Sequence, residues 1–296
     1  MKNRCLVVGC NGKFGAIFAE KLGGEGLDVD GMDLAPAPAR PGLFKHYLSA
    51  NSSRPDQAAL DLLAAADCVL LCVPESAVVD SIPILRDSVK SDAVIVDIAS
   101  IKTRIEQAVR RAAPRSGYLS IHPMFGPLRS FESGNICVVP FSENEQSAWF
   151  IGLLEKWNAK LTTLSAGEHD RNAAYIQSMT HAALLQIAGA LGRAGLPLET
   201  IEALSTPVQR AVLALCARIV SADPALYWEI QSVNPFASQA RADYGKAWDA
   251  LSDAVDGSDY EAFKRQFEEI AEYLGPALPS LADLSDAIVE IARDER

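Results

Sequence analysis

The first thirty or so residues constrain the fold more than any other stretch of the chain. Residues 4–9, Arg-Cys-Leu-Val-Val-Gly, form a short apolar run that leads into a glycine-containing turn and then a helical segment at residues 16–22. A second apolar run at residues 27–32 ends at Asp33. A strand, a glycine turn, a helix, a second strand and an acid in this order are typical of a dinucleotide-binding unit. The sequence therefore predicts an α/β fold that begins with a Rossmann-type domain.

The glycine turn and its surroundings carry the residues that we expect to bind the cofactor. Glycines let the backbone approach a pyrophosphate, and the N-terminus of the following helix supplies free N–H groups and a partial positive charge. The spacing is GxxGxxG, with Cys10 at the position of the usual first glycine. Asp33 would accept hydrogen bonds from ribose hydroxyls and would repel a 2′-phosphate, which favours NAD over NADP. The predicted cofactor-binding residues are Gly9, Asn11, Gly12, Lys13, Phe14, Gly15, Asp33, Val73, Pro74 and Ser100.

The remaining apolar patterns predict two domains. Continuous apolar runs at residues 68–74 and 93–97 are typical of parallel strands buried on both faces, with a crossover helix at 78–90. Residues 34–58 are expected to form a loop with one short helix, and further strands are expected at 118–121, 136–141 and 160–164, with a helix at 146–157. From residue 167 onward only helical periodicity is present, at 170–191, 207–221, 224–231, 235–255, 260–274 and 281–293. We therefore predict a Rossmann domain at residues 1–166 and an all-helical substrate-binding and dimerisation domain at residues 167–296.

Composition excludes several classes of partner and site. The net charge of −11 argues against a nucleic-acid partner, because phosphate binding needs a basic face, and means that a small anionic substrate would need local cations. No apolar run approaches the roughly 20 residues that cross a bilayer, and the N-terminus runs directly into a strand, so we expect a cytoplasmic protein without membrane contact. The six cysteines lack paired CxxC spacing, which predicts reduced thiols, no disulfide and no metal site.

Three side chains outside the glycine turn have the chemistry of a reactive site. His122, in Ser120-Ile-His-Pro-Met-Phe-Gly-Pro127, follows an expected strand, and the carboxyl ends of strands are where open α/β sheets bind ligands. A neutral imidazole there can accept a proton, although a buried histidine bonded to a loop carbonyl is the alternative. Arg218 lies within an apolar helix and could capture a carboxylate, pair with an acid or reach solvent. His181 lies on a long amphipathic helix.

Taken together, these motifs resemble the prephenate dehydrogenase family of tyrosine biosynthesis. The resemblance rests on the glycine turn at residues 9–15, on Asp-Ile-Ala-Ser-Ile-Lys at 97–102 and on His-Pro-Met-Phe-Gly-Pro at 122–127. It continues through residues 169–181 and 204–227, in the same order along the chain. The six-residue string that begins with His122 is the most specific of these pieces.

The resemblance implies a reaction and a role for each matching residue. The implied reaction is the NAD-dependent oxidative decarboxylation of prephenate to 4-hydroxyphenylpyruvate, in which hydride leaves C4 and aromatisation of the ring drives the loss of carboxylate. His122 would be the base on the C4 hydroxyl, and Ser100 would orient the substrate. Arg218 would hold a substrate carboxylate. The residues implied to line the pocket are His181, Lys102, Thr180, Gln177 and Tyr227. Independently of the resemblance, the large apolar content of the helical half predicts a homodimer, because such a surface is often buried against a second copy.

One departure from the family pattern leaves the substrate open. Relatives usually carry arginine immediately before the histidine that His181 matches, whereas this chain has Thr180, and the chorismate mutase domain to which relatives are commonly fused is not part of it. Both features also resemble the 4-amino-4-deoxyprephenate dehydrogenases, which make 4-aminophenylpyruvate for antibiotic pathways. Replacing a cation beside a C4 ammonium would relieve repulsion.

Three more distant functions share parts of this pattern. An arogenate dehydrogenase would differ only in the substrate side chain. A β-hydroxyacid dehydrogenase would need a catalytic lysine, and residues 170–191 contain none. A non-catalytic NAD-sensing dimer would have no use for a base aimed at the nicotinamide.

Overall fold

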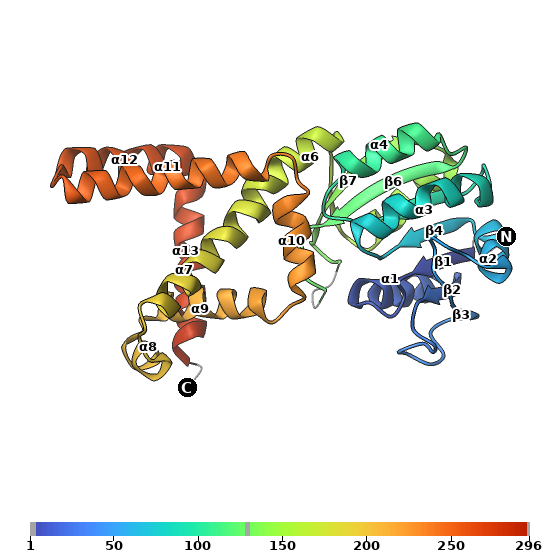
Figure 1. Cartoon of the computed structure of the whole chain (residues 1–296), viewed down its shortest axis with the longest axis horizontal. Coiled ribbons are helices and arrows are strands. Elements are labelled where there is room, and N and C mark those ends of the chain that lie inside the picture. Colours follow the sequence, from blue (N-terminus) through green and yellow to red (C-terminus); the bar gives the residue numbers. More distant parts are fainter. Residues whose placement is uncertain (1–3, 128–130, 295–296) are drawn as a thin grey trace. The chain divides into compact units, whose positions relative to one another are not determined.

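The computed structural model describes residues 4–127 and 131–294 of the chain (Figure 1). It consists of two compact units, the first ending at Ala173 and the second beginning at Ala174. The first unit is an α/β unit and the second is entirely helical, which confirms the predicted fold class. The assignment of residues 1–166 and 167–296 to cofactor binding and to substrate binding stays a prediction.

An eight-stranded, mostly parallel sheet forms the first unit, in the order β3-β2-β1-β4-β5-β6-β7-β8. Its strands are β1 (Arg4–Val8), β2 (Asp28–Asp33), β3 (Tyr47–Ser49), β4 (Cys68–Leu71), β5 (Val94–Asp97), β6 (Gly117–Pro123), β7 (Asn135–Ser142) and β8 (Lys160–Thr163). Within the described part of the chain, only the β6–β7 pairing is antiparallel. Every residue of β4, β5 and β6 is buried, and the continuous apolar character of β4 and β5 predicts this for those two strands.

Helices cover both faces of this sheet. On one face, α1 (Lys13–Gly24) and α5 (Glu145–Lys156) pack through side chains such as Phe18 and Phe150. On the other face, α2 (Gln57–Ala65), α3 (Glu75–Ser88) and α4 (Thr103–Ala112) contribute Leu63, Ile82 and Ile105. Two apolar layers thus hold the strands, and the carboxyl ends of the parallel strands share one edge of the sheet.

The sequence patterns miss several of the smaller elements. The segment expected to be a loop at residues 34–58 contains β3, a three-residue edge strand too short to show an alternating pattern. The segment from Asp97 to Gly117 contains α4, whose first turn follows Lys102 directly. The helix expected at residues 170–191 is divided into α6 (Ala166–Ala173), the π-helix η1 (Ala174–Met179) and α7 (Thr180–Arg193).

The second unit continues from η1 and α7 with further helices. These are α8 (Leu198–Leu204), α9 (Pro207–Val220), α10 (Pro224–Ser232), α11 (Ala237–Asp256), α12 (Tyr260–Leu274), the 3₁₀ turn η2 (Gly275–Ala277) and α13 (Leu278–Asp294). Asp223 caps α10 by accepting a hydrogen bond from the Ala225 backbone, as its Asp-Pro start predicts. Helix α11 begins two residues later than Pro235, because Asn234 closes a turn by accepting from the Phe236 N–H.

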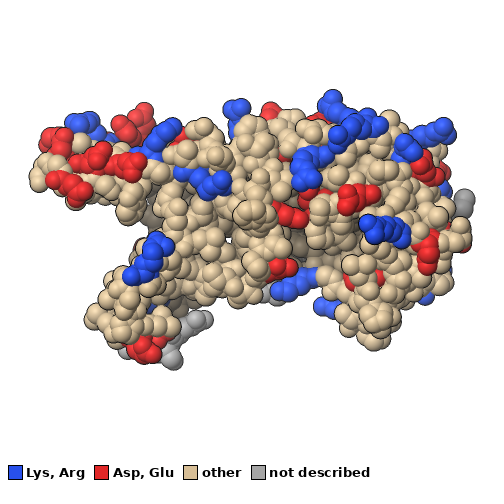
Figure 2. Space-filling view, viewed as in Figure 1, with Lys and Arg blue, Asp and Glu red and all other residues tan. Residues whose placement is uncertain are grey.

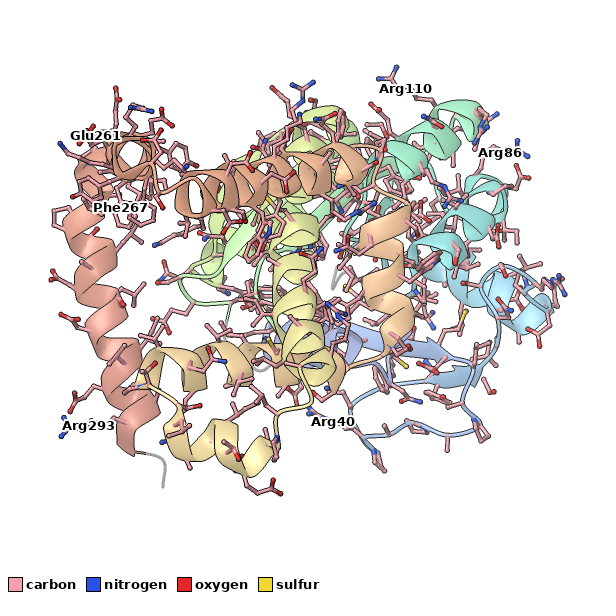
Figure 3. All side chains as sticks on the ribbon, turned by 60° about the vertical axis from the view of Figure 1, so that its left-hand side comes forward. Arg40, Arg86, Arg110, Glu261, Phe267 and Arg293 are labelled. Carbon is pink, nitrogen blue, oxygen red and sulfur yellow. The ribbon has the colours of Figure 1, made fainter. Side chains whose placement is uncertain are left out.

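The helical unit leaves much of its apolar surface uncovered. No residue of α7, α8 or α12 is buried. Figure 2 shows few charged side chains over α7 and α9, whereas charges gather on α12. The ring of Phe267, labelled in Figure 3, packs 4.9 Å from that of Phe263 and is still 62% exposed. Among the described residues, no single helix is long and apolar enough to cross a membrane; only the pair α9 and α10, bent by 96°, passes that test of length and composition together.

Candidate active site

The glycine turn between β1 and α1 is packed so tightly that side chains cannot replace its hydrogens. Gly9 has a φ of +74°, and a Cβ added to it would lie 2.3 Å from the Cys72 carbonyl oxygen at the end of β4. A Cβ added to Gly15 would lie 2.2 Å from the Gly9 carbonyl oxygen. The Gly12 N–H donates to the same Gly9 carbonyl at 3.0 Å. Glycine is therefore required at these positions by close backbone approach.

Asp33 and Asn11 organise the chain around this turn. The Asp33 carboxylate accepts hydrogen bonds from the Asn11 N–H at 2.9 Å and from the Ala35 N–H at 3.1 Å. The Asn11 amide in turn donates to the Ala37 carbonyl at 3.1 Å and accepts from the Ala39 N–H at 2.7 Å. Asp33 and Asn11 thus join the glycine turn to the segment that follows β2.

This end of α1 suits an anionic group. Its N-cap is Gly12, so no side chain satisfies the first N–H groups of the helix, and Lys13 is exposed beside them. Val73 is half-buried, and its Cγ1 would lie 2.8 Å from a Cβ on Gly9. Pro74 is exposed at the start of α3. The arrangement fits a dinucleotide, because a backbone cradle for phosphates lies beside a carboxylate suited to a ribose.

His122 lies at the carboxyl end of β6, where the sequence places it. It is 4% exposed, in a strand whose residues are all buried. The loop that follows turns Phe125 onto Phe131, with ring centroids 5.6 Å apart, and towards Phe14 of α1, at 6.3 Å. The segment that carries His122 is therefore joined by aromatic packing to the helix that begins at the glycine turn.

Lys102 lies in the interior of the first unit rather than on a surface. Its side chain is fully buried, and Nζ donates to the carbonyl of Ala99 at 2.5 Å and to that of Ile121 at 2.7 Å. These carbonyls directly precede Ser100 and His122 in the chain. The buried ammonium thus ties the segment after β5, which carries Ser100, to the end of β6, which carries His122.

A buried carboxylate accompanies this ammonium. Asp97 Oδ1 lies 3.6 Å from Lys102 Nζ and accepts hydrogen bonds from Ser120 Oγ at 2.8 Å and from the Ala99 N–H at 3.0 Å. Burial raises the pKa of Asp97 and lowers that of Lys102. Ser120 is not among the predicted site residues, since a serine inside an apolar strand gives no signal of its own.

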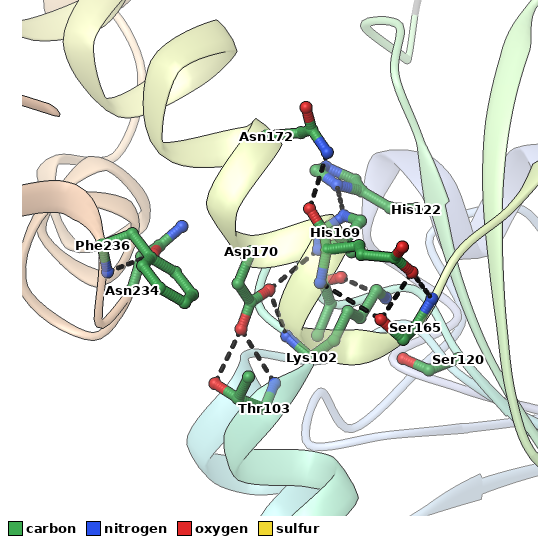
Figure 4. A network of polar contacts seen from close by, with 12 residues as sticks. Lys102, Thr103, Ser120, His122, Ser165, His169, Asp170, Asn172, Asn234 and Phe236 are labelled. Carbon is green, nitrogen blue, oxygen red and sulfur yellow. Dashed lines mark hydrogen bonds and ion pairs between the residues drawn. The ribbon is translucent and has the colours of Figure 1, made fainter.

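A chain of three polar side chains extends from His122 into α6 (Figure 4). His122 Nδ1 lies 2.9 Å from His169 Nε2, and His169 Nδ1 lies 2.8 Å from Asp170 Oδ1. Asp170 accepts hydrogen bonds from the backbone N–H groups of Lys102 and Thr103, both at 2.9 Å. The sequence shows His169-Asp170 as part of a family-like motif, but only the fold reveals that the pair meets His122.

Burial keeps the imidazole of His122 neutral. It lowers the pKa of His122 well below the ordinary value, and the nearby Lys102 ammonium and the His169 ring lower it further. The imidazole of His122 is therefore uncharged at neutral pH and can act as a base.

The remaining predicted site residues belong to the second unit. The rings of His181 on α7 and Tyr227 on α10 meet edge to face, 5.0 Å apart, and burial lowers the pKa of His181. Thr180 is exposed at the start of α7, and Gln177 is half-buried in η1. Arg218 is exposed on α9 and forms no ion pair with any residue of 4–127 or 131–294.

Comparisons with known proteins agree with this organisation. Residues 46–160 match the family model for the nucleotide-binding domain of prephenate dehydrogenase, and residues 165–269 match the model for its dimerization domain. The chain is 33% identical to a 4-amino-4-deoxyprephenate dehydrogenase of Streptomyces pristinaespiralis, over 92% of this chain and 91% of that protein. It is 29% identical to the T-protein of Enterobacter agglomerans, over 98% of this chain and 73% of that one.

A solved structure shares the fold at lower identity. The prephenate dehydrogenase of Aquifex aeolicus in complex with hydroxyphenyl propionate and NAD+ matches with a TM-score of 0.71 and 17% identity, over 92% of this chain and 97% of that one. With an identity above 30% over nearly all of the chain, the family is established by the sequence matches. The chain belongs to the prephenate dehydrogenase family and is a dehydrogenase of that family.

Proposed function

We propose that this protein catalyses the NAD-dependent oxidative decarboxylation of a prephenate-type cyclohexadiene, with His122 as the base. The observation that carries the proposal is the buried, neutral imidazole at the end of β6, in the same unit as the glycine turn that fits a dinucleotide. A base beside a nicotinamide site is the minimum that this reaction needs, because aromatisation supplies the driving force.

The cofactor is NAD, held by the glycine turn. Gly9, Gly12 and Gly15 would cradle the pyrophosphate at the start of α1, and Asp33 would accept from the ribose. NAD is favoured over NADP because Asp33 would repel a 2′-phosphate. When bound, NAD+ accepts the hydride that leaves C4 of the substrate.

For prephenate, His122 takes the proton of the C4 hydroxyl while the C4–H electron pair departs as hydride. The resulting carbonyl draws electrons from the C1–carboxylate bond, which breaks to release CO₂ and leaves an aromatic ring. The proton returns to the ring oxygen, so the net reaction consumes and releases no proton. His122 thus needs only to hold one proton between two steps, which suits a group whose pKa is below neutrality.

The substrate carries two carboxylates, and the second unit offers the groups to recognise them. Arg218 is an exposed guanidinium without an ion-pair partner among the described residues, and it would hold one carboxylate. His181, Gln177 and Tyr227 would contact the remainder of the ring and side chain. Ser100, one residue after the Ala99 carbonyl that Lys102 fixes, would orient the C4 substituent.

A homodimer formed through the helical unit is part of the proposal. Side chains as large as Trp228 and Trp248 are 71% and 61% exposed in a single chain, and no residue of α12 is fully buried. Apolar surface of this extent is typical of an interface between subunits. The matching of residues 165–269 to a dimerization domain supports the same conclusion.

A second substrate, 4-amino-4-deoxyprephenate, is favoured by one comparison and by the family resemblance. The match to the Streptomyces enzyme of that name has a higher identity than the match to the T-protein. The resemblance implies that Thr180 replaces an arginine, whose charge would repel a C4 ammonium if position 180 lines that part of the pocket. In this reaction the C4 ammonium loses its proton to His122 before hydride leaves, and the net reaction releases one proton.

The deciding experiment measures NADH formation with NAD+ and prephenate, 4-amino-4-deoxyprephenate or arogenate, using the wild type and His122→Asn. The substrate with the highest kcat/KM identifies the reaction, and a tenfold preference corresponds to about 1.4 kcal/mol. The variant Thr180→Arg is expected to shift the ratio of the prephenate rate to the amino-compound rate about tenfold towards prephenate. An unchanged ratio would remove Thr180 from the argument, and no turnover of any of the three would refute the proposed function.

A further inference from the structure

We propose that His169 and Asp170 are positioning residues that set the tautomer of His122, so that its Nδ1 carries the hydrogen and its Nε2 carries the lone pair. The inference rests on the proposed role of His122 as the base. It is carried by the buried chain of side chains that runs from His122 through His169 to Asp170 (Figure 4).

Asp170 determines which atoms donate and which accept along this row of hydrogen bonds. Its Oδ1 accepts from the Lys102 N–H, and its Oδ2 accepts from the N–H and the hydroxyl of Thr103, at 2.9 and 2.7 Å. Burial alone would raise its pKa, but the hydrogen bonds from His169 and Thr103 outweigh it and hold the pKa below the ordinary value. Asp170 is therefore ionised at neutral pH and can only accept hydrogen bonds.

An acceptor at one end determines every donor that follows. Because Asp170 can only accept, His169 Nδ1 must carry a hydrogen. Burial lowers the pKa of His169, so the ring is neutral and its Nε2 bears a lone pair. His122 Nδ1 must then donate to that lone pair, and since His122 is also neutral, its own Nε2 is the unprotonated nitrogen.

This tautomer is the one that the reaction requires. A His122 with its hydrogen on Nε2 would present a donor to the substrate and could not take a proton from it. Once His122 has taken the proton, its Nδ1–H bond to His169 becomes charge-assisted, and the chain ends on the Asp170 carboxylate. His169 and Asp170 thus act through His122, without a reacting atom of their own.

Asp170 also binds the backbone at the start of α4, beside the lysine that contacts the strand of His122. The two N–H groups that it binds open helix α4, directly after Ser100 and Ile101, and the side chain of Lys102 holds the carbonyl that precedes His122. Cys137 is paired with His122 across β6 and β7, and the Asp97 carboxylate lies 3.6 Å from Lys102 Nζ. Asp97 accepts hydrogen bonds from Ser120 and from the Ala99 N–H, whereas His122 Nδ1 lies 2.9 Å from His169 Nε2.

Two substitutions of matched size test the chain. In His169→Gln the amide nitrogen can donate to Asp170 while the amide oxygen accepts from His122, which keeps the polarity of the native pair. In His169→Leu neither bond can form. We expect the leucine variant to lose about 100-fold or more in kcat with little change in KM, and the glutamine variant to stay within about tenfold of the wild type. Equal losses in both variants would mean a merely structural role and would overturn the proposal.

A double-mutant cycle locates the effect. In a His122→Asn background, His169→Leu is expected to cause no further loss, because both changes remove the same function. Additive losses would contradict the inference. His46→Gln, a change at a histidine that bonds Asp30 elsewhere in the first unit, is the matched control and should leave kcat unchanged.

The tautomer itself is measured by nitrogen-15 NMR of the imidazole rings in the wild-type full chain. Variants are needed only to assign the signals. The chain has four histidines, so single substitutions assign the signals. We expect His122 to show a protonated Nδ1 and an unprotonated Nε2, and the opposite tautomer would overturn the inference. Full activity of His122→Asn would instead refute the proposed function, whereas an inactive His122→Asn beside a fully active His169→Leu would refute this inference alone.

Discussion

The two units of this protein differ in which side chains they bury and which they expose to solvent. The first unit buries charged and polar side chains and satisfies them internally: Lys102 and Asp170 are fully buried, and each has several hydrogen-bond partners. The second unit leaves large apolar side chains in solvent, among them Trp228 and Tyr273, the latter 88% exposed. Buried charges are costly unless paired, and exposed apolar area is costly unless covered.

This difference indicates which unit would contribute to the proposed chemical step and which to substrate binding and association. His122, the proposed base, and the two side chains proposed to orient it, His169 and Asp170, all lie within the α/β unit of a single chain. In the helical unit no residue of α7, α8 or α12 is buried, and the proposed dimer would cover part of this surface. We therefore expect changes in the first unit to act on the chemical step and on folding, and changes in the second to act on binding and association.

The largest expected effect comes from removing the base. His122→Asn should lower kcat by about 1,000-fold, within the range that general base catalysis contributes, while the affinity for NAD+ is unchanged. The matched change in the second unit, His181→Asn, should mainly raise KM. Steady-state kinetics with titrations of NAD+ check both, and the comparison breaks if His181→Asn lowers kcat as much as His122→Asn does.

The next effect concerns the stability of the buried network. Asp170→Asn should cost about 3 kcal/mol, since it removes one partner of a buried pair and leaves a backbone N–H of α4 facing an amide hydrogen. Asp243→Asn in the second unit, where the carboxylate accepts from Tyr175 and Lys246 at the surface, should cost much less, because solvent screens an exposed ion pair. Urea unfolding measures both, and equal costs would contradict the distinction drawn between the units.

A smaller effect is expected on association. Phe267→Glu, which places a charge on the exposed face of α12, should weaken the dimer about 30-fold, corresponding to roughly 2 kcal/mol for one aromatic anchor. Leu34→Glu, at an apolar side chain of the first unit that is 73% exposed, serves as the control and should leave association unchanged. Sedimentation over a range of concentrations distinguishes them. Dissociation caused by the Leu34 variant would place the interface elsewhere.

The last effect is a pH dependence of stability that originates in the first unit. Burial lowers the pKa of His122 and of His169, so the unfolded chain binds protons at these sites before the folded chain does. The free energy of unfolding is therefore highest above the histidine pKa of the unfolded chain, near 6.5. It falls as the pH drops below that pKa, by up to about 1.4 kcal/mol per pH unit for each histidine. His169→Leu should reduce the slope of the unfolding free energy between pH 6.5 and 5, and an unchanged slope would contradict the assignment.

Much of the fold follows from local patterns. Continuous apolar runs identify β4 and β5, and Asp223 followed by Pro224 marks the start of α10. Elements without such patterns escape prediction. Strand β3 is short and lies at an edge, and the π-helix η1 interrupts a helical repeat that continues on both sides. Helix α4 follows the segment that contains Ser100 and Lys102, and the sequence does not show what these polar side chains contact.

The sequence by itself determined the α/β class, the glycine turn, the terminal acid at Asp33 and the position of His122 at the end of a strand, because these depend on short-range spacing and on periodic burial. The tertiary structure decided that His169 and Asp170, 47 and 48 residues after His122, complete its hydrogen-bond chain, and that Lys102 is an internal tie between two strand ends. Spacing along the chain cannot show such contacts, because hydrogen-bond direction and burial arise only when distant segments pack together.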